Sequence, residues 1–164
     1  MKAALRATTA SVEETMALGG ALAGLARPGD ILLLSGDLGT GKTAFTKGFA
    51  AGLGVVDQVV SPTFTIARDY DGRLRMHHLD VYRLDFLQEA IDLGLAELTD
   101  DGGVTVIEWG EVVIPTLPPD YLEVRMGYGE RDDDRRIELV PVGVAWASRS
   151  GELAGALAPW REAR

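Results

Sequence analysis

The stretch ILLLSGDLGTGKTAF, residues 31 to 45, decides how this chain begins to fold. It opens with four consecutive apolar residues, as expected of a parallel strand that is buried on both faces. A glycine-rich loop follows, and beyond it Phe45, Phe49 and Leu53 recur every four residues. That spacing predicts a helix, which should stop near Gly54. The loop therefore connects a buried strand to a helix.

The loop from Gly36 to Thr43 matches the pattern G-x-x-x-x-G-K-[ST] at every fixed position. Glycines let backbone N–H groups turn inward around phosphates, and the following helix N-terminus adds partial positive charge. We expect Lys42 to reach the β- and γ-phosphates of a nucleoside triphosphate and the Thr43 hydroxyl to meet Mg²⁺. A chance glycine turn is the weaker alternative, because a strand and a helix flank the loop. The predicted nucleotide-binding residues here are Asp37, Leu38, Gly39, Thr40, Gly41, Lys42, Thr43 and Ala44.

The composition predicts a single domain over residues 1–164. The chain has 164 residues, 46% of them hydrophobic, which is enough for a sizeable core. Its formal net charge of -9 argues against direct nucleic-acid binding, because a protein that binds a polyanion needs a basic footprint. The sequence contains no cysteine, its first six residues lack the apolar core of a signal peptide, and no apolar run is long enough to span a bilayer. We therefore expect a cytoplasmic protein.

The remaining pattern predicts the α/β class, with a P-loop NTPase-like mixed β-sheet flanked by helices. Further strands are expected at residues 3–8, 63–70, 73–79, 104–107, 121–126 and 136–140. Asp71-Gly72 is a hairpin signal between two of these strands. Ser11 and Glu14 fit a capping box, which opens a helix with a predicted apolar face of Val12, Met16, Leu22 and Leu25. Another helix is expected at 87–98, and the Ala- and Gly-rich tail from about 142 is expected to be partly helical.

Two carboxylates at predicted strand ends are candidates for binding the metal ion. Asp80 ends the run RMHHLD, and Glu108 ends the run VTVIE. One such residue alone is more often a solvated or capping carboxylate, but two beside a phosphate-binding loop favour a metal site. The spacing does not decide whether Asp80 or Glu108 contacts the metal.

The stretch SPTFT, residues 61–65, lies where nucleotide switches often place a threonine that senses the γ-phosphate and Mg²⁺. Thr63 is the candidate, while Pro62 fits equally well a plain loop end before a strand. The adjacent His77 and His78 should face opposite sides of a strand, so they cannot easily share one metal ion. We interpret both as structural, with His78 nearer to the site.

Four motifs taken together resemble the TsaE (YjeE) family of small bacterial ATPases of tRNA threonylcarbamoyladenosine synthesis. They are GDLGTGKT, SPTFT, HLDVYRL and IEWGE, in this order, and the likeness runs from about residue 11 to residue 139. The resemblance implies that ATP and Mg²⁺ drive turnover of a complex of the TsaD and TsaB proteins. TsaD holds the site that transfers threonylcarbamoyl to adenosine beside the tRNA anticodon, so tRNA is reached only through the complex.

The resemblance also implies roles for individual residues. Lys42, Asp80 and Thr63 would be catalytic, as the phosphate-binding lysine, the acid that orients water and the switch threonine. Thr43 and Glu108 would coordinate Mg²⁺. The family arginine near the nucleotide corresponds to Arg135 or its neighbour Arg136, the aromatic Trp109 is a family position, and the segment 8–12 would help to enclose the adenine.

Two rival functions share these features. Small-molecule and nucleoside kinases have the same loop and Mg²⁺, but they usually close an arginine-rich lid over the transferred phosphate, and no segment here resembles such a lid. The second rival is a nucleotide-gated binding module whose hydrolysis is incidental and whose switch region around Thr63 contacts a partner. Phosphate release from ATP without an added acceptor would count against the kinase.

Overall fold

The computed structural model describes residues 4–37, 39–60, 67–80, 101–108, 114–115 and 117–161. The predicted helix at 87–98 and the predicted positions Leu38, Thr63 and Trp109 lie outside these residues. Among the helices in the described ranges, none has the length and apolar character needed to cross a membrane.

The described residues form a mixed α/β structure, as predicted. Its strands are β1 Leu5–Thr9, β2 Ile31–Ser35, β3 Ala67–Tyr70, β4 Met76–Asp80, β5 Val104–Glu108, β6 Tyr121–Tyr128 and β7 Arg135–Val142. Its helices are α1 Val12–Ala23, α2 Lys42–Gly52, α5 Val144–Ala147 and α6 Ser150–Leu157, followed by the 3-10 helix η2 Ala158–Trp160.

These strands build one sheet in the order β1-β7-β6-β2-β5-β4-β3. The central strand β2 is parallel to both of its neighbours, β5 and β6, and β4 is parallel to β5. The edge pairs β3–β4, β6–β7 and β1–β7 are antiparallel. All five residues of β2 are buried, as the apolar run Ile31–Leu34 predicts for a central parallel strand.

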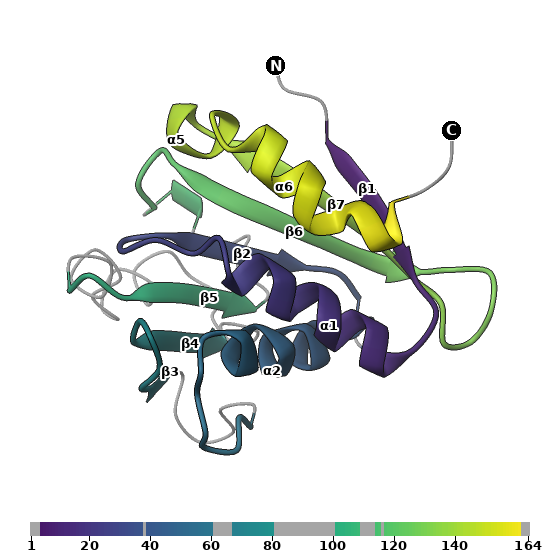
Figure 1. Ribbon diagram of the computed structural model, residues 1–164, viewed down its shortest axis with the longest axis horizontal. Coiled ribbons are helices and arrows are strands. Elements are labelled where there is room, and N and C mark those ends of the chain that lie inside the picture. The colour runs from purple at the N-terminus through teal and green to yellow at the C-terminus, as the bar shows by residue number, and fades with distance from the viewer. Residues whose placement is uncertain are drawn as a thin grey trace.

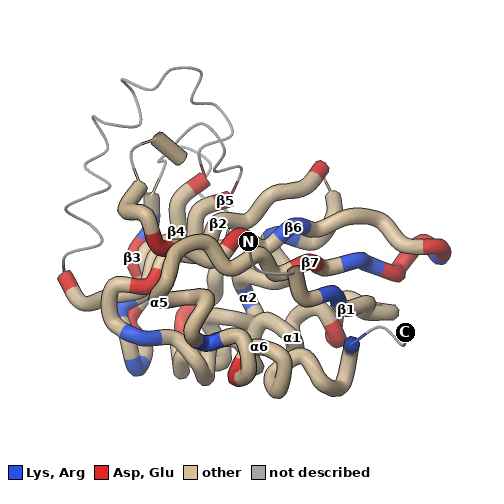
Figure 2. The backbone as a smooth tube through the Cα atoms, turned by 90° about the horizontal axis from the view of Figure 1, so that it is seen from above, with Lys and Arg blue, Asp and Glu red and all other residues tan. Residues whose placement is uncertain are grey.

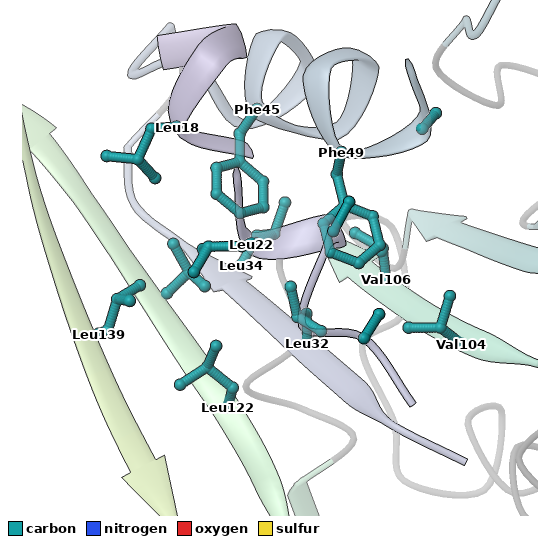
Figure 3. Packing of buried hydrophobic residues seen from close by; sticks show 14 of the residues in the cluster. Leu18, Leu22, Leu32, Leu34, Phe45, Phe49, Val104, Val106, Leu122 and Leu139 are labelled. Carbon is teal, nitrogen blue, oxygen red and sulfur yellow. The ribbon is translucent and has the colours of Figure 1, made fainter. Parts of the chain in front are cut away.

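Helices α1, α2 and α6 cover one face of this sheet (Figure 1). Figure 3 shows Phe45 and Phe49 of α2 pointing toward the sheet, above β2 and β5. Both phenylalanines are fully buried, and Leu53 is 1% exposed, so the predicted four-residue spacing marks the buried face of α2. Gly54 has a φ of 84°, a conformation suited to glycine just beyond a helix end.

The predicted capping box sets the start of α1. Ser11 Oγ accepts a hydrogen bond from the Glu14 N–H at 3.1 Å. Glu14 Oε1 in turn accepts from the N–H of Ala10 at 3.2 Å. Together these bonds satisfy two backbone donors and fix where the chain turns from β1 into the helix.

The prediction of the buried face of α1 is wrong in part. Val12 was placed on that face but is 54% exposed, whereas Thr15 and Leu18 are buried. Gly19, a residue without an apolar signal, lies in the contact with α2. A Cβ atom on Gly19 would lie 2.5 Å from the carbonyl oxygen of Phe45.

Glycines let α1 and α2 pack backbone against backbone. A Cβ atom on Gly48 would lie 1.9 Å from the carbonyl oxygen of Met16, and one on Gly52 would lie 2.6 Å from that of Gly20. Any side chain at these two positions would push the helices apart. This close contact holds α2, and with it the loop that precedes α2, in place against the sheet.

The β3–β4 hairpin is longer than its sequence signal predicts. Asp71-Gly72 indicates a tight turn and a strand from 73, but β3 ends at Tyr70 and β4 begins at Met76. The connection instead docks onto the helices, because Arg73 donates through Nη2 to the Ala23 carbonyl at 2.7 Å and through its N–H to Leu53 O at 2.6 Å. These bonds compete with extension of the strand.

The tail is partly helical, as expected, and α6 packs against α1 and β1. Arg149, just before α6, forms a buried ion pair with both oxygens of Asp30, at 2.7 Å each. The Arg149 guanidinium also lies over the ring of Trp146, 4.1 Å from its centroid. The tail is thereby tied to the turn that precedes β2.

Candidate functional site

The glycine-rich loop leaves the carboxyl end of β2 and enters α2, so its two ends are fixed by the centre of the sheet and by a buried helix. Gly36, Gly39 and Gly41 have φ values of 146°, 82° and 102°, all in the region that side chains disfavour. A Cβ atom on Gly36 would also lie 2.3 Å from the carbonyl oxygen of Met126 in β6. The loop backbone therefore follows a path that requires glycine.

The first backbone N–H groups of α2 point toward this loop. Its N-cap is Gly41, which has no side chain with which to cap the helix. Thr40, inside the loop, turns its hydroxyl to the Asp37 carbonyl at 2.8 Å. An uncapped helix N-terminus next to a glycine loop has the donors and the partial positive charge that bind phosphate.

Lys42 is the buried cation of the loop, with 5% of its surface exposed. Its Nζ donates to the carbonyl oxygens of Gly36 and Asp37, at 2.7 and 2.8 Å. The ammonium thus lies across the loop that it follows in sequence. Both acceptors are backbone carbonyls of the glycine-rich loop itself.

Thr43 and Glu108 meet across the space between α2 and β5. The distance from Thr43 Oγ1 to Glu108 Oε1 is 3.4 Å, and Glu108 is 3% exposed. Asp80 pairs in register with Glu108 at the ends of the parallel strands β4 and β5, so both side chains leave the sheet on the same face. A hydroxyl and two carboxylates at one sheet edge form an oxygen-rich donor set of the kind Mg²⁺ prefers.

His78 reaches the same carboxylate from within β4. It is fully buried, and its Nε2 is hydrogen-bonded to Glu108 Oε2. Alternation along a strand puts His78 and Asp80 on one face and His77 on the other. His77 accordingly contacts Asp69 and Asp101 instead, at 2.7 Å each.

A second group of residues borders the loop on the side of β6 and β7. Arg135 donates through Nη2 to the Gly39 carbonyl at 3.4 Å, and its guanidinium lies 5.2 Å from the centroid of the Tyr128 ring. A Cβ atom on Gly39 would lie 3.1 Å from the Tyr128 hydroxyl. The neighbouring Arg136 is exposed and lines a groove on the other face of the sheet, so of the two arginines it is Arg135 that faces the loop.

The predicted adenine segment lies beside the same loop. Thr9 pairs in register with Arg135, and Thr8 pairs with Arg136. The Thr9 hydroxyl shares a buried hydrogen bond of 2.7 Å with the hydroxyl of Thr15. Because a Cβ on Gly41 would lie 3.7 Å from Thr15 Cγ2, the end of β1 and the first turns of α1 border the loop.

These residues fit a bound nucleoside triphosphate with Mg²⁺. The buried ammonium of Lys42, the uncapped start of α2, the Thr43–Glu108 pair and Asp80 lie at one end of the sheet. They supply respectively a cation, N–H donors and oxygen ligands. Nothing can be said of Leu38 and Thr63 in this arrangement, because both lie outside the described residues.

Sequence reasoning missed Tyr128 and Met126, which border the loop, and it missed the bond between His78 and Glu108. Tyr128 and Met126 are more than 80 positions beyond the loop, so no local spacing connects them to it. The alternation in MHHLD does place His78 on the face of Asp80. The register between β4 and β5, which no sequence pattern gives, was needed to find its partner.

Strands β6 and β7 carry both basic and acidic residues (Figure 2). Arg6 is paired with Glu138, and Arg125 with Glu123 and Glu138, at distances of 2.9–3.2 Å. Acidic residues alternate with the arginines there, in keeping with the overall negative charge of the chain.

Comparisons with known proteins agree with one another. A family model described as "Threonylcarbamoyl adenosine biosynthesis protein TsaE" matches residues 9–137. The tRNA threonylcarbamoyladenosine biosynthesis protein TsaE of Bacillus subtilis (strain 168) is 44% identical over 153 residues, covering 91% of this chain and 93% of that protein. Its counterpart in Treponema pallidum (strain Nichols) is 43% identical over 114 residues, 70% of this chain and 84% of that protein. The crystal structure of Bacillus subtilis YdiB superposes with a TM-score of 0.82 at 40% identity, covering 94% of this chain and 97% of that one.

Proposed function

Because this chain belongs to the TsaE family of tRNA threonylcarbamoyladenosine biosynthesis, we propose that it binds ATP with Mg²⁺ at the loop after β2 and hydrolyses it. The observation that carries the proposal is the buried ammonium of Lys42 within a glycine loop, at the end of the sheet where Thr43 meets Glu108. Hydrolysis would support turnover of a complex of TsaB and TsaD, which modifies the tRNA.

Phosphate binding is the role proposed for the loop itself. Lys42 would exchange the carbonyls of Gly36 and Asp37 for oxygens of the β- and γ-phosphates. A phosphate oxygen carries negative charge whereas a carbonyl oxygen is neutral, so the ammonium attracts the phosphate more strongly, which favours this exchange. The N–H groups at the start of α2 would bind the same phosphates, and Gly39 and Gly41 leave room for them.

Thr43 and Glu108 are the proposed ligands of the metal ion. They would hold Mg²⁺, which would supply positive charge to offset the negative charge of the phosphates. Asp80, the register neighbour of Glu108, is proposed to accept a hydrogen bond from the attacking water and so to orient it. Thr63 completes the proposal as the switch threonine.

The base of the nucleotide is assigned to the side of the loop where β1, β6 and β7 end. Arg135 contacts the Gly39 carbonyl there, and Thr9 of the segment 8–12 pairs with it in register. Arg135 is also held by the Asp132 and Asp134 carbonyls, at 2.6 and 2.8 Å, so its position is set before any ligand binds. We propose that these groups enclose the adenosine moiety.

The most informative test measures phosphate release from ATP by this chain alone and with its TsaB and TsaD partners. We expect hydrolysis in water without a phosphate acceptor, and faster hydrolysis with both partners present. Hydrolysis that requires a small-molecule acceptor would contradict the proposal in favour of a kinase. An unchanged rate on adding TsaB and TsaD would contradict the partner assignment alone.

The Asp80→Asn variant tests the role of ATP cleavage. The amide keeps the size of the side chain but loses the charge that orients water, so ATP affinity should stay near normal while hydrolysis slows. In a reaction reconstituted with TsaB, TsaD, tRNA and threonylcarbamoyl-adenylate, a single round should be largely spared and repeated rounds lost. Normal repeated turnover by a variant that hydrolyses no ATP would contradict this role.

A further inference from the structure

Two adjacent histidines on β4, both buried, have different hydrogen-bonding partners. His77 uses both ring nitrogens, Nδ1 with Asp69 and Nε2 with Asp101, at 2.7 Å each. His78 uses Nε2 with Glu108, while its buried Nδ1 has no partner among the described residues. His77 is therefore satisfied as a cross-link between loops and strands, whereas the polar contacts of His78 are directed at Glu108.

The contact between His78 and Glu108 joins one ring nitrogen to one carboxylate oxygen. In the ionised form that binds a cation, a carboxylate only accepts hydrogen bonds, and in that state His78 donates from Nε2–H to Glu108 Oε2. That bond engages one oxygen of Glu108. The other oxygen, Oε1, lies 3.4 Å from Thr43 Oγ1. The two oxygens of the carboxylate are thus divided between a histidine and the hydroxyl of α2.

We propose that His78 is a positioning residue, which orients the Glu108 carboxylate so that Oε1 and the Thr43 hydroxyl converge on one divalent cation. The inference rests on the proposed function, because it assumes that a cation is bound there with the nucleotide. His78 itself is not a ligand in this account, since its donating nitrogen is occupied by Oε2. It acts on the metal only through Glu108.

The burial of His78 and Glu108 strengthens the argument that His78 sets the orientation of the carboxylate. Glu108 is 3% exposed and His78 fully buried, so water does not readily replace either partner. Residues that hydrogen-bond to a metal ligand typically contribute about 10- to 100-fold to metal affinity or activity, because they fix the orientation and basicity of the ligand. A purely structural His78 would change the stability of the fold without a selective change in metal affinity.

Two amide substitutions separate these roles. In His78→Gln the amide nitrogen lies near the original Nε2 and can still donate to Glu108. In His78→Asn the amide nitrogen lies near the original Nδ1 and falls short. Both variants keep a polar side chain at a buried position, so a change in polarity alone does not distinguish them. His77→Gln on the same strand is the matched control.

The measurement is Mn²⁺ affinity by electron paramagnetic resonance, at saturating non-hydrolysable ATP analogue, together with analogue affinity in EDTA. We expect His78→Asn to weaken Mn²⁺ binding about 10- to 100-fold and His78→Gln to restore most of the loss. His77→Gln should keep wild-type Mn²⁺ affinity. Analogue affinity in EDTA should stay unchanged in every variant.

Wild-type Mn²⁺ affinity in His78→Asn would overturn the inference while leaving the proposed function intact. Equal losses in His78→Asn and His77→Gln would also overturn it, because they would indicate a general effect on the strand. If the wild-type chain bound no Mn²⁺ in the presence of the analogue, the proposed function would fail as well. If His78→Asn does not fold, His78→Gln decides the question. A roughly 10-fold loss of Mn²⁺ affinity in His78→Gln would contradict the inference, because that variant keeps the hydrogen-bond donor.

Discussion

Lys42 and Arg149 are both buried cations, 5% and 6% exposed, but they lie in different parts of the fold. Arg149 is matched by a carboxylate, because both oxygens of Asp30 accept from its guanidinium at 2.7 Å. Lys42 Nζ is held by two backbone carbonyls of its own loop. The first arrangement is an ion pair between the tail and the turn before β2, and the second places the ammonium across the glycine-rich loop.

The surroundings of the two cations also differ. The Asp30 carboxylate also accepts from the Arg27 N–H at 2.7 Å, so the pair is built into the turn before β2. Lys42 instead follows Gly36, Gly39 and Gly41, whose φ values are positive, and is the first residue of a helix without a side-chain cap. We infer that Arg149 serves the fold and Lys42 serves a ligand.

The largest expected effect is that of breaking the ion pair in the tail. Arg149→Met should lower the free energy of unfolding by about 3–5 kcal/mol, because it leaves the Asp30 carboxylate buried without its cation. Urea unfolding followed by circular dichroism measures the loss. ATP affinity, where the variant is folded, should match that of the wild type; a selective loss of affinity would break the comparison.

Lys42→Ala should have the opposite profile. Losing charge-assisted bonds to the phosphates should cost about 2 kcal/mol of binding, a roughly 30-fold weaker affinity, while the fold is retained. Calorimetric titration with ATP and Mg²⁺ measures the affinity, and the same urea experiment measures the stability. Normal ATP binding by this variant would remove Lys42 from the phosphate site.

A surface ion pair should matter much less than the buried one. Arg27 Nη2 lies 3.3 Å from Glu152 Oε2, with the two side chains 55% and 50% exposed. Arg27→Ala should therefore change the free energy of unfolding by less than about 1 kcal/mol, since solvent screens the pair. This variant is the control for Arg149→Met, because both connect the region before β2 to the tail. Equal losses in the two would mean that burial is not what distinguishes them.

The smallest effect is expected at Asp101 and appears only in acid. The Gly103 N–H donates to Asp101 and, with help from His77, holds the pKa of this carboxyl below its usual 3.8. A lowered pKa in the folded state stabilises the protein above pH 3.8, and that contribution is lost as the pH falls further. Asp101→Asn should therefore give a shallower loss of stability with falling pH below about 4. The measurement is the unfolding midpoint of the variant and of the wild type at several acid pH values. Equal slopes of the midpoint against pH in the two proteins would contradict the assignment.

Local patterns predicted the parts of this molecule that local physics determines. The strand from Ile31, the glycine loop and the helix with Phe45 and Phe49 all follow from neighbouring residues, and each lies where the sequence places it. The face of α1 could not be predicted in the same way. Gly19 makes the contact with α2, and a periodicity of apolar side chains does not detect glycine.

Contacts between residues far apart in the chain also could not be predicted from the sequence. Asp30 and Arg149 are 119 positions apart, and His78 and Glu108 are 30 apart. Neither separation in sequence corresponds to the spacing of contacts within a helix or a hairpin. Only the packing of α6 and the register of β4 with β5 reveal these pairs. The candidate metal ligand was thus predictable from its strand end, but the residue that holds it was not.

A crystal structure of the chain with Mg²⁺ and a non-hydrolysable ATP analogue tests most directly whether Lys42 is the ligand-binding cation. We predict that Lys42 Nζ leaves the carbonyls of Gly36 and Asp37 for the β- and γ-phosphates, while the two bonds between Arg149 and Asp30 remain. A structure in which the analogue binds elsewhere, with Lys42 still on both carbonyls, would contradict the account.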